Sequence, residues 1–346
     1  MHVVHLMANN SSVPYLNWFA DEIKNYPGHK LSFVVLHASK PQMLDDMRLR
    51  GCDCFWIRFD HTKRKSNMLR ILPQLIKLFK AVKPDVINTH LFDDSLPGLL
   101  AARLAGIKKR VITKGDTTFH WNYAKKWVWA DKLNNFNATS IVAISNESKE
   151  FILKKEKADP SKVSMIHHGI CIDALSKQND LYKNELKKKY QLCGHIVIGT
   201  VARYIEWKGY RYIIEAASQI VSKYPAVKFV FIGEGNQRDE LNALIAHYGL
   251  QENIVLTGWV DREYIPSFYG IMDIYVHAAT EEPFGFVIAE AMVNGVPLVT
   301  TQTGAAADAL QHKKNGYFVS EQNSEEIVDG INWMLEDDKR KETIAK

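Results

Sequence analysis

Short apolar runs alternate with helical patterns along the whole chain, and this alternation constrains the possible folds more than any other feature. In the N-terminal half the apolar runs are His2 to Met7, Leu31 to Leu36, Asp85 to Thr89, Arg110 to Thr113 and Ser140 to Ile144. Short apolar strands separated by helices pair in parallel through right-handed crossovers. The pattern therefore predicts an α/β fold with doubly wound parallel sheets, in which ligands bind at the carboxyl ends of the strands.

The length of 346 residues is enough for two domains of ordinary size, each with its own core. The sequence becomes strongly polar between Ile172 and Cys193, which is typical of a connection between domains. We predict an N-terminal domain over residues 1–172, a connection over residues 173–194 and a C-terminal domain over residues 195–346. Two such domains would leave a cleft between them.

The composition excludes several classes of protein. Hydrophobic residues make up 46% of the chain and charged residues 24%, which is typical of a soluble globular protein. We find no apolar run that could span a bilayer and no signal segment, so we expect a cytoplasmic protein. Four cysteines without zinc-site spacing indicate reduced thiols. The net charge of +5 comes without a nucleic-acid-binding motif, so it suits polyanionic cosubstrates or an acidic membrane surface.

The segment Glu281 to Thr300 carries the most specific local pattern. It predicts a loop, a helix over about Phe286 to Asn294 and a buried strand over Val296 to Thr301. The main chain from Phe284 to Val287 would offer unpaired N–H groups at the positive end of the helix dipole, and Gly285 would let a ligand approach closely. This arrangement predicts an anion site, most simply for phosphate.

Glu282 and Glu290 bracket the start of this predicted helix. Carboxylates accept hydrogen bonds well from vicinal diols, so one acid could bind sugar hydroxyls while the other binds the ribose of a nucleotide. The alternative is structural, with Glu290 a solvated helix residue and Glu282 a cap.

The first strand of the C-terminal domain, predicted over His195 to Val201, is followed by Arg203 and Lys208. An arginine fork clasps phosphate oxygens and a lysine adds a point charge, so this pair could neutralise a diphosphate. Solvated charge on a loop is the alternative. The turn Gly233 to Asn236 has only two of the three glycines of a dinucleotide fingerprint, which excludes a nicotinamide site.

The motif from Glu282 to Val299, with Glu-Pro-Phe-Gly followed by Glu-Ala-Met and Gly-x-Pro-Leu-Val, resembles the signature of the family 4 retaining glycosyltransferases. The resemblance runs over most of the chain and is richest from Gly199 onward. It implies the GT-B architecture, in which two doubly wound Rossmann-like domains face a central cleft, and a nucleotide sugar as the cosubstrate.

The resemblance also implies roles for single residues. Arg203 and Lys208 would hold the donor diphosphate and, with Glu282 on the sugar, would form the catalytic set, while Glu290 would hold the ribose. The other donor-binding candidates are Gly235, Trp259, Val260, Phe284, Gly285, Phe286 and Val287. Trp259 and Val260 would face the base, with simple packing as the alternative for Trp259.

Acceptor-side candidates follow predicted strands of the N-terminal domain. His90 occupies the second histidine of a family segment, and Asp116 and His120 follow the next strand. The alternatives are a histidine satisfied inside the protein and an acid that caps a loop. The chain departs from the family pattern at Lys114 and His168, where the family has a histidine and an asparagine.

Together these features favour a retaining glycosyltransferase that moves a sugar from a UDP- or GDP-linked donor to a hydroxyl of a glycan or lipid-linked acceptor, in cell-envelope polysaccharide or glycolipid synthesis. We expect no cofactor and no metal, because the motif lacks an Asp-x-Asp pair and the two cations supply positive charge. The alternatives are a sugar-nucleotide epimerase or hydrolase of the same fold and a non-catalytic nucleotide-sugar-binding module. The sequence leaves the sugar, the base and the acceptor open.

Two basic stretches could bind an anionic membrane peripherally at the inner face of the plasma membrane. One runs from Lys63 to Lys80 with interleaved apolar residues, and the other, Lys125 to Trp129, combines lysines with tryptophans. Packing of these stretches on the sheet is the alternative.

Overall fold

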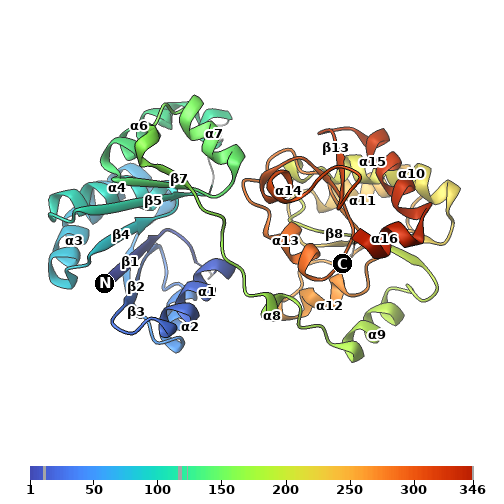
Figure 1. Cartoon of the computed structure of the whole chain (residues 1–346), viewed down its shortest axis with the longest axis horizontal. Helices are drawn as coiled ribbons and strands as arrows, with labels where there is room; N and C mark the ends of the chain where they lie inside the picture. The colour runs from blue at the N-terminus through green and yellow to red at the C-terminus, as the bar shows by residue number, and fades with distance from the viewer. Residues whose placement is uncertain (11–12, 116–118, 123, 345–346) are drawn as a thin grey trace. The chain divides into compact units, whose positions relative to one another are not determined.

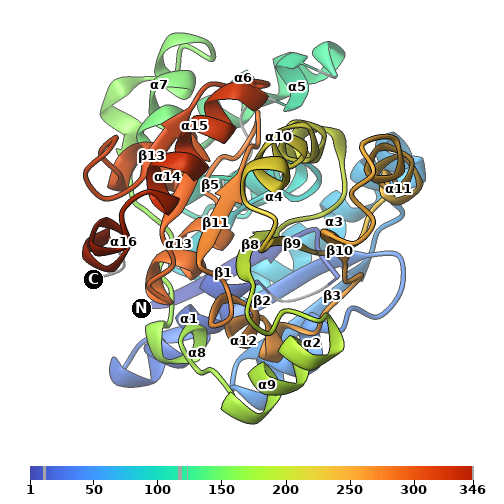
Figure 2. The same cartoon turned by 90° about the vertical axis from the view of Figure 1, so that its right-hand side faces the viewer.

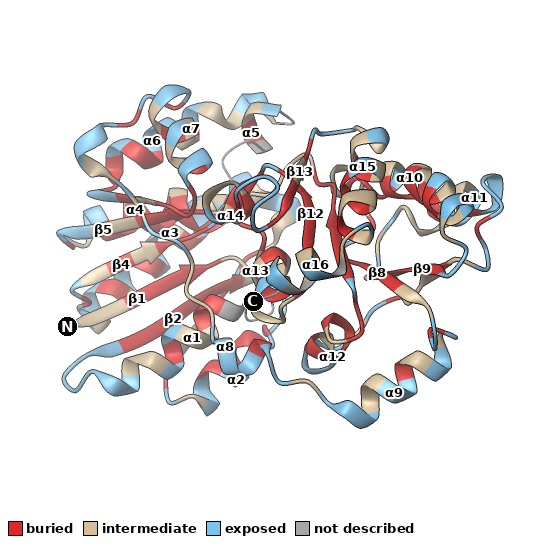
Figure 3. Ribbon diagram, turned by 45° about the vertical axis from the view of Figure 1, so that its right-hand side comes forward, coloured by how far each residue is buried: buried red, intermediate tan, exposed pale blue. Residues whose placement is uncertain are grey.

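The structure, a computed structural model, describes residues 1–10, 13–115, 119–122 and 124–344. The chain forms two compact units, Met1–Cys171 (unit 1) and Ile172–Lys346 (unit 2), and each is built on one parallel sheet with helices around it (Figure 1). Burial is concentrated in the strands and on the inner sides of the helices (Figure 3). These two doubly wound sheets confirm the predicted α/β fold class.

Unit 1 contains a seven-stranded sheet in the order β3-β2-β1-β4-β5-β6-β7. The strands are β1 (His2–Met7), β2 (Lys30–His37), β3 (Asp53–Arg58), β4 (Val86–Thr89), β5 (Lys109–Lys114), β6 (Ser140–Ala143) and β7 (Val163–Met165). The strand order reverses between β1 and β4, which pair directly. The sequence analysis did not predict β3, although Cys54 to Ile57 form a short apolar run, and in the structure this edge strand buries only Ile57.

Seven α-helices of unit 1 are described around this sheet. They are α1 (Pro14–Glu22), α2 (Met43–Leu49), α3 (Arg64–Val82), α4 (Phe92–Leu104), α5 (Phe119–Asn122), α6 (Val128–Asn137) and α7 (Asn146–Lys154). Helix α3 buries Ile71, Leu75 and Phe79 in the core beside Ile87 of β4. The apolar side of this basic helix therefore packs on the sheet, which is the alternative that we gave for the first basic stretch.

Unit 2 contains a six-stranded sheet in the order β10-β9-β8-β11-β12-β13 (Figure 2). The strands are β8 (Ile196–Val201), β9 (Val227–Ile232), β10 (Ile254–Leu256), β11 (Ile274–His277), β12 (Leu298–Thr301) and β13 (Tyr317–Val319). Here the strand order reverses between β8 and β11, whose pairing places Ile198 opposite Ile274. Loops diverge at such a reversal, so it is the expected ligand position.

The helices of unit 2 begin within the polar segment that follows unit 1. They are α8 (Ile172–Leu175), α9 (Asp180–Lys189), α10 (Tyr210–Lys223), α11 (Arg238–His247), α12 (Ile265–Tyr269), α13 (Phe286–Val293), α14 (Gly304–Ala309), α15 (Ser324–Leu335) and α16 (Asp338–Ile344). Helix α9 buries Leu186 in the same core as Phe268 of α12. No helix among the described residues of either unit is long and apolar enough to cross a membrane.

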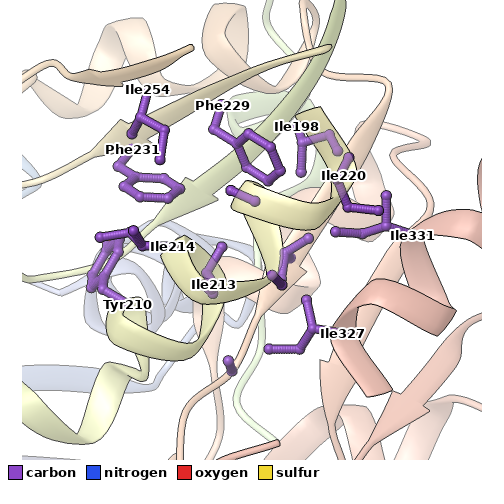
Figure 4. Packing of buried hydrophobic residues seen from close by; sticks show 14 of the residues in the cluster. Ile198, Tyr210, Ile213, Ile214, Ile220, Phe229, Phe231, Ile254, Ile327 and Ile331 are labelled. Carbon is purple, nitrogen blue, oxygen red and sulfur yellow. The ribbon is translucent and has the colours of Figure 1, made fainter. Parts of the chain in front are cut away.

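The larger core of unit 2 lies between its sheet and helices α10 and α15. Figure 4 shows Phe231 of β9 close to Ile214 of α10, and Ile220 of α10 beside Ile331 of α15. Burial of an aliphatic or phenylalanine side chain contributes about 1.5–3 kcal/mol, so this cluster holds the helices on the sheet firmly. The loops at the carboxyl edge of the sheet are therefore carried by a rigid support.

Candidate functional site

Two loops meet where the strand order of unit 2 reverses. One follows β8 and ends with the short 3₁₀ helix η5 (Glu206–Lys208), and the other follows β11. They bring Lys208 Nζ to 2.5 Å from Glu282 Oε2, with the two side chains only 12% and 14% exposed. The structure thus joins two of the three predicted catalytic residues in a largely buried ion pair at the carboxyl edge of the sheet.

The main chain holds the first loop against the second. Gly209, with φ 69°, directly follows η5, and a Cβ at this position would lie 2.0 Å from the carbonyl oxygen of Ala278. Thr280 N donates a hydrogen bond to Trp207 O at 2.9 Å. A glycine is needed here because the backbone is left-handed and the two loops touch. This contact positions the Lys208 side chain over the second loop.

His277, the last residue of β11, is fully buried, and its Nε2 lies 3.3 Å from Glu282 Oε2. Burial raises the pKa of Glu282, but the contact with His277 and the charge of Lys208 outweigh this effect and lower the pKa to about 2. Burial lowers the pKa of His277 itself. Near neutral pH the site therefore holds a carboxylate and a neutral imidazole beside Lys208. The sequence analysis missed His277, for which the only signal was its place at the end of a strand.

Arg203, the third predicted catalytic residue, is exposed, and its side chain makes no hydrogen bond or ion pair with the described residues. Its loop is nevertheless fixed, because Tyr204 N donates to Glu234 O at 3.0 Å. A Cβ on Gly235 would lie 2.2 Å from Tyr204 O, so this predicted donor-binding glycine also permits the close approach of the two loops. Arg203 is a cation on an ordered loop that is available to a ligand.

The predicted anion site lies at the start of α13. Gly285, with φ 82°, directly precedes the helix, and the N–H of Ile288 bonds back to Gly285 O at 2.9 Å. The N–H groups of Phe286 and Val287 come before this bond, at the positive end of the helix dipole. Phe284 is buried and anchors the preceding loop. The structure thus has a left-handed glycine directly before a helix start, and a phosphate site here stays a prediction.

Glu290, in the second turn of α13, is only 4% exposed. Its carboxylate accepts hydrogen bonds from Arg262 Nη2 at 2.6 Å and from Tyr269 Oη at 3.2 Å. Burial raises the pKa of Glu290, although the charge of Arg262 opposes this shift. Glu290 is thus a partnered, buried acid and not a solvated helix residue. The sequence analysis missed Arg262, because nothing in its own segment marks it as the partner of Glu290.

The loop after β10 carries the two residues predicted to face the base. Trp259 is 75% exposed, and its Nε1 lies 3.4 Å from Asp261 Oδ1. Val260 is half-buried and packs against the core. Packing therefore does not account for Trp259, and the same loop continues directly to Arg262, the partner of Glu290.

At the reversal point of unit 1, His90 follows β4 and is buried. Its Nε2 lies 2.8 Å from His5 Nδ1 and its Nδ1 lies 3.2 Å from Tyr15 Oη, while the Tyr15 ring stacks on His168. Burial lowers the pKa of His5 and of His168 to about 4, and that of His90 well below its ordinary value. Both ring nitrogens of His90 are engaged inside the protein, so an acceptor could reach them only if these neighbours moved.

The other acceptor-side candidates follow β5. His120 Nδ1 lies 2.9 Å from Asp131 Oδ2 of α6. Asp116 lies outside the described residues. Lys114 is buried in an ion pair with Glu156, so an internal structural contact occupies the position of the family's histidine.

Both halves of the chain match models of known glycosyltransferase families. Residues 183–346 match the family model of the glycosyl transferases group 1, and residues 26–174 match that of glycosyltransferase family 4. The capsular polysaccharide biosynthesis glycosyltransferase CapM of Staphylococcus aureus is 30% identical over 286 residues, which are 80% of this chain and 74% of CapM. The UDP-Gal:alpha-D-GlcNAc-diphosphoundecaprenol alpha-1,3-galactosyltransferase of Escherichia coli is 25% identical over 78% of this chain and 71% of its own length. Anabaena Alr3699/HepE, solved in complex with UDP, has the same fold, with a TM-score of 0.84 at 21% identity over 100% of this chain and 93% of its own.

The cluster of His5, His90 and His168 in unit 1 makes the free energy of unfolding depend on pH. Its folded pKa values lie below the ordinary value of 6.5, so between about pH 6.5 and pH 4 the unfolded chain binds protons that the folded cluster does not. We predict that the free energy of unfolding falls as the pH falls through this window and that His168→Asn, which cannot titrate there, reduces the slope. Thermal unfolding at about pH 7 and about pH 5 measures the effect. His29→Asn, at an exposed histidine of the same unit, is the control. Equal slopes in the wild type and His168→Asn would contradict the prediction.

Proposed function

The chain belongs to the glycosyltransferases, and on this premise we propose that it moves a sugar from a UDP- or GDP-linked donor to a hydroxyl of a glycan or lipid-linked acceptor in cell-envelope polysaccharide or glycolipid synthesis. The observation that carries the proposal is the ion pair between Lys208 and Glu282 near the start of α13. Arg203, whose side chain has no partner among the described residues, lies on the same edge of the sheet. Two cations, a carboxylate and a helix N-terminus suit a ligand that carries both a diphosphate and a sugar.

The proposed donor spans the carboxyl edge of the unit 2 sheet. Its diphosphate would lie between Arg203, Lys208 and the first N–H groups of α13. Glu282 would accept hydrogen bonds from sugar hydroxyls, and Glu290, whose oxygens already accept from Arg262 and Tyr269, would use remaining lone pairs for the ribose diol. The base would lie beside Trp259, whose exposed ring offers a stacking surface.

The proposed reaction proceeds with retention at the sugar. The bond between C1 and the diphosphate oxygen breaks, the acceptor oxygen bonds to C1 on the same face, and the acceptor proton passes to an oxygen of the departing diphosphate. Arg203, Lys208 and the helix dipole would stabilise the charge that grows on the diphosphate. Covalent attack by Glu282 is the lesser alternative. This scheme has no step that requires a metal, and independence from metals stays a prediction.

A uridine nucleotide is our first choice of donor. HepE structures contain UDP or UDP-glucose, and the Escherichia coli relative is named for the use of UDP-Gal. We predict that UDP-sugars raise the unfolding temperature in a thermal-shift panel, since a ligand at a hundredfold excess over its Kd adds about 2.7 kcal/mol of stability. A shift with GDP-sugars alone would replace uridine by guanosine, and no shift with any nucleotide would contradict the donor site.

Product analysis separates the proposal from the alternatives that the sequence left open. Release of free sugar without an acceptor would identify a hydrolase, and conversion of the nucleotide sugar into an isomer would identify an epimerase. Binding without turnover in any acceptor extract would identify a non-catalytic module.

We predict that Arg203→Ala lowers turnover by about a hundredfold or more and leaves the unfolding temperature unchanged, because this side chain has no partner among the described residues. Initial rates with a nucleotide-sugar donor and thermal unfolding measure the two effects. Arg211→Ala, at an exposed arginine of α10 that pairs with Glu215, is the matched control. A rate for Arg203→Ala equal to that of the control would remove Arg203 from the site.

A peripheral membrane contact of unit 1 is the second part of the proposal. Trp129, Leu133 and Phe136 are 54%, 38% and 67% exposed, and they lie on one side of α6 because residues three and four apart share a helix face. Exposed Lys125 and Lys132 flank this surface, which we name the α6 face. A face that combines tryptophan, phenylalanine and lysine suits the interface of an anionic bilayer.

The structure changes which tryptophan belongs to this surface. Trp127 packs against Phe92 with ring centroids 5.0 Å apart, so it contributes to the fold of unit 1. Asp131, on the other side of α6, pairs with His120, so the same helix carries the α6 face and the partner of an acceptor-side candidate.

We predict that the protein sediments with anionic liposomes at low salt and that Trp129→Ala with Phe136→Ala lowers the bound fraction by about fivefold or more. Binding should weaken with salt, since each basic residue near an anionic surface contributes about 1 kcal/mol of screened attraction. Leu49→Ala with Leu104→Ala is the control, because these leucines are 88% and 56% exposed elsewhere in unit 1. A wild-type protein that stays in the supernatant would favour a soluble acceptor.

A further inference from the structure

The ion pair between Lys208 and Glu282 joins the two groups that the proposed function assigns to different parts of the donor. We propose that a donor diphosphate takes Lys208 away from Glu282, and that His277 is the positioning residue that then holds Glu282 for the sugar. This inference rests on the proposed function, because it concerns the same donor site. It makes recognition of the sugar conditional on the diphosphate.

The geometry of the pair favours such an exchange. Lys208 Nζ lies 2.5 Å from Glu282 Oε2, and both side chains are shielded from water, so each charge is balanced mainly by the other. A diphosphate at the start of α13 would lie next to Gly285, only a few residues from the Glu282 carboxylate. Like charges repel strongly in such a shielded site. Binding of the diphosphate is therefore eased if Lys208 turns towards the phosphate, which the flexible lysine stem allows.

Arg203 suits the first contact with the donor. Its side chain is exposed and makes no hydrogen bond or ion pair with the described residues, so it can meet an incoming phosphate without losing a partner. Lys208, in contrast, must give up Glu282. The two cations therefore have different roles. Arg203 binds the diphosphate first, and Lys208 then leaves Glu282 to bind it as well.

His277 is placed to replace Lys208. Its Nε2 lies 3.3 Å from the same oxygen of Glu282, yet this buried nitrogen has no hydrogen-bond partner of good geometry among the described residues. A buried polar atom with an unused hydrogen bond is costly, and a small rotation of the Glu282 carboxylate would satisfy it. Because the imidazole is neutral and sits on a rigid strand, it can hold the carboxylate without neutralising it.

The exchange predicts an unusual effect of removing the acid. In the wild type, free UDP must break the pair with Glu282 to reach Lys208, whereas Glu282→Gln leaves the lysine uncommitted. Calorimetric titration should therefore show that Glu282→Gln binds UDP about fivefold or more tightly than the wild type. Glu206→Gln, at an exposed acid of η5 in the same loop as Lys208, controls for the general loss of one negative charge. UDP affinity equal to or weaker than that of this control would overturn the exchange.

A double-mutant cycle with UDP tests His277. His277→Leu should weaken UDP binding about fivefold in the wild-type background, because the released Glu282 then has no second partner. In the Glu282→Gln background the same substitution should have no effect, and His277→Gln, which keeps a donor, should restore part of the loss. Equal weakening in both backgrounds would show that His277 acts only on the fold.

Failure of this inference can be told from failure of the proposed function. If the wild-type protein binds neither UDP nor GDP, the donor site itself is wrong. If it binds UDP and Glu282→Gln binds no more tightly than Glu206→Gln, the donor site stands and only the exchange is wrong.

Discussion

The parallel pairing of β8 with β11 is the contact on which the candidate site depends. Two side-chain hydrogen bonds reinforce it, from Thr200 Oγ1 to Val276 O at 2.9 Å and from Tyr275 Oη to Val201 O at 3.2 Å. Because the strand order reverses here, one loop carries Lys208 and the neighbouring loop carries Glu282 to the same edge. Side chains alternate along a strand, so a slip of one residue would turn His277 to the other face of the sheet. Register therefore decides the chemistry of this edge.

Each of three largely buried glutamates has a cation beside it, because a buried carboxylate needs a partner of opposite charge. An unpaired buried charge costs several kcal/mol, and Glu282, Glu290 and Glu156 avoid this cost through Lys208, Arg262 and Lys114 respectively. The last pair is 1% and 6% exposed inside unit 1, where it serves the fold. The first lies beside a helix N-terminus, where a diphosphate could compete for the lysine. The same physical rule thus produces a structural bridge in one unit and an exchangeable pair in the other.

Much of this arrangement was accessible from local sequence patterns. The alternation of strands and helices predicted both parallel sheets, and the motif around Gly285 predicted the helix start and the acids beside it. The edge strand β3 was missed because its apolar run, Cys54 to Ile57, is short and lies between the charged residues Asp53 and Arg58. Arg262 and His277 were missed because their partners are set by folding and not by spacing in the chain. Trp127 and Trp129 occur in one short motif, and only packing shows that Trp127 contacts Phe92 while Trp129 remains 54% exposed.

By itself, the sequence determined the fold class, the glycosyltransferase resemblance and the residues that could serve the donor, because hydrophobic period and motif are properties of neighbouring residues. Only the tertiary structure decided that Lys208 is paired with Glu282, that Arg203 is uncommitted and that both nitrogens of His90 are engaged. The physical reason is that the strength of a charge or a hydrogen bond depends on burial and on the partner within about 3 Å. Both are decided by which loops the sheet brings together.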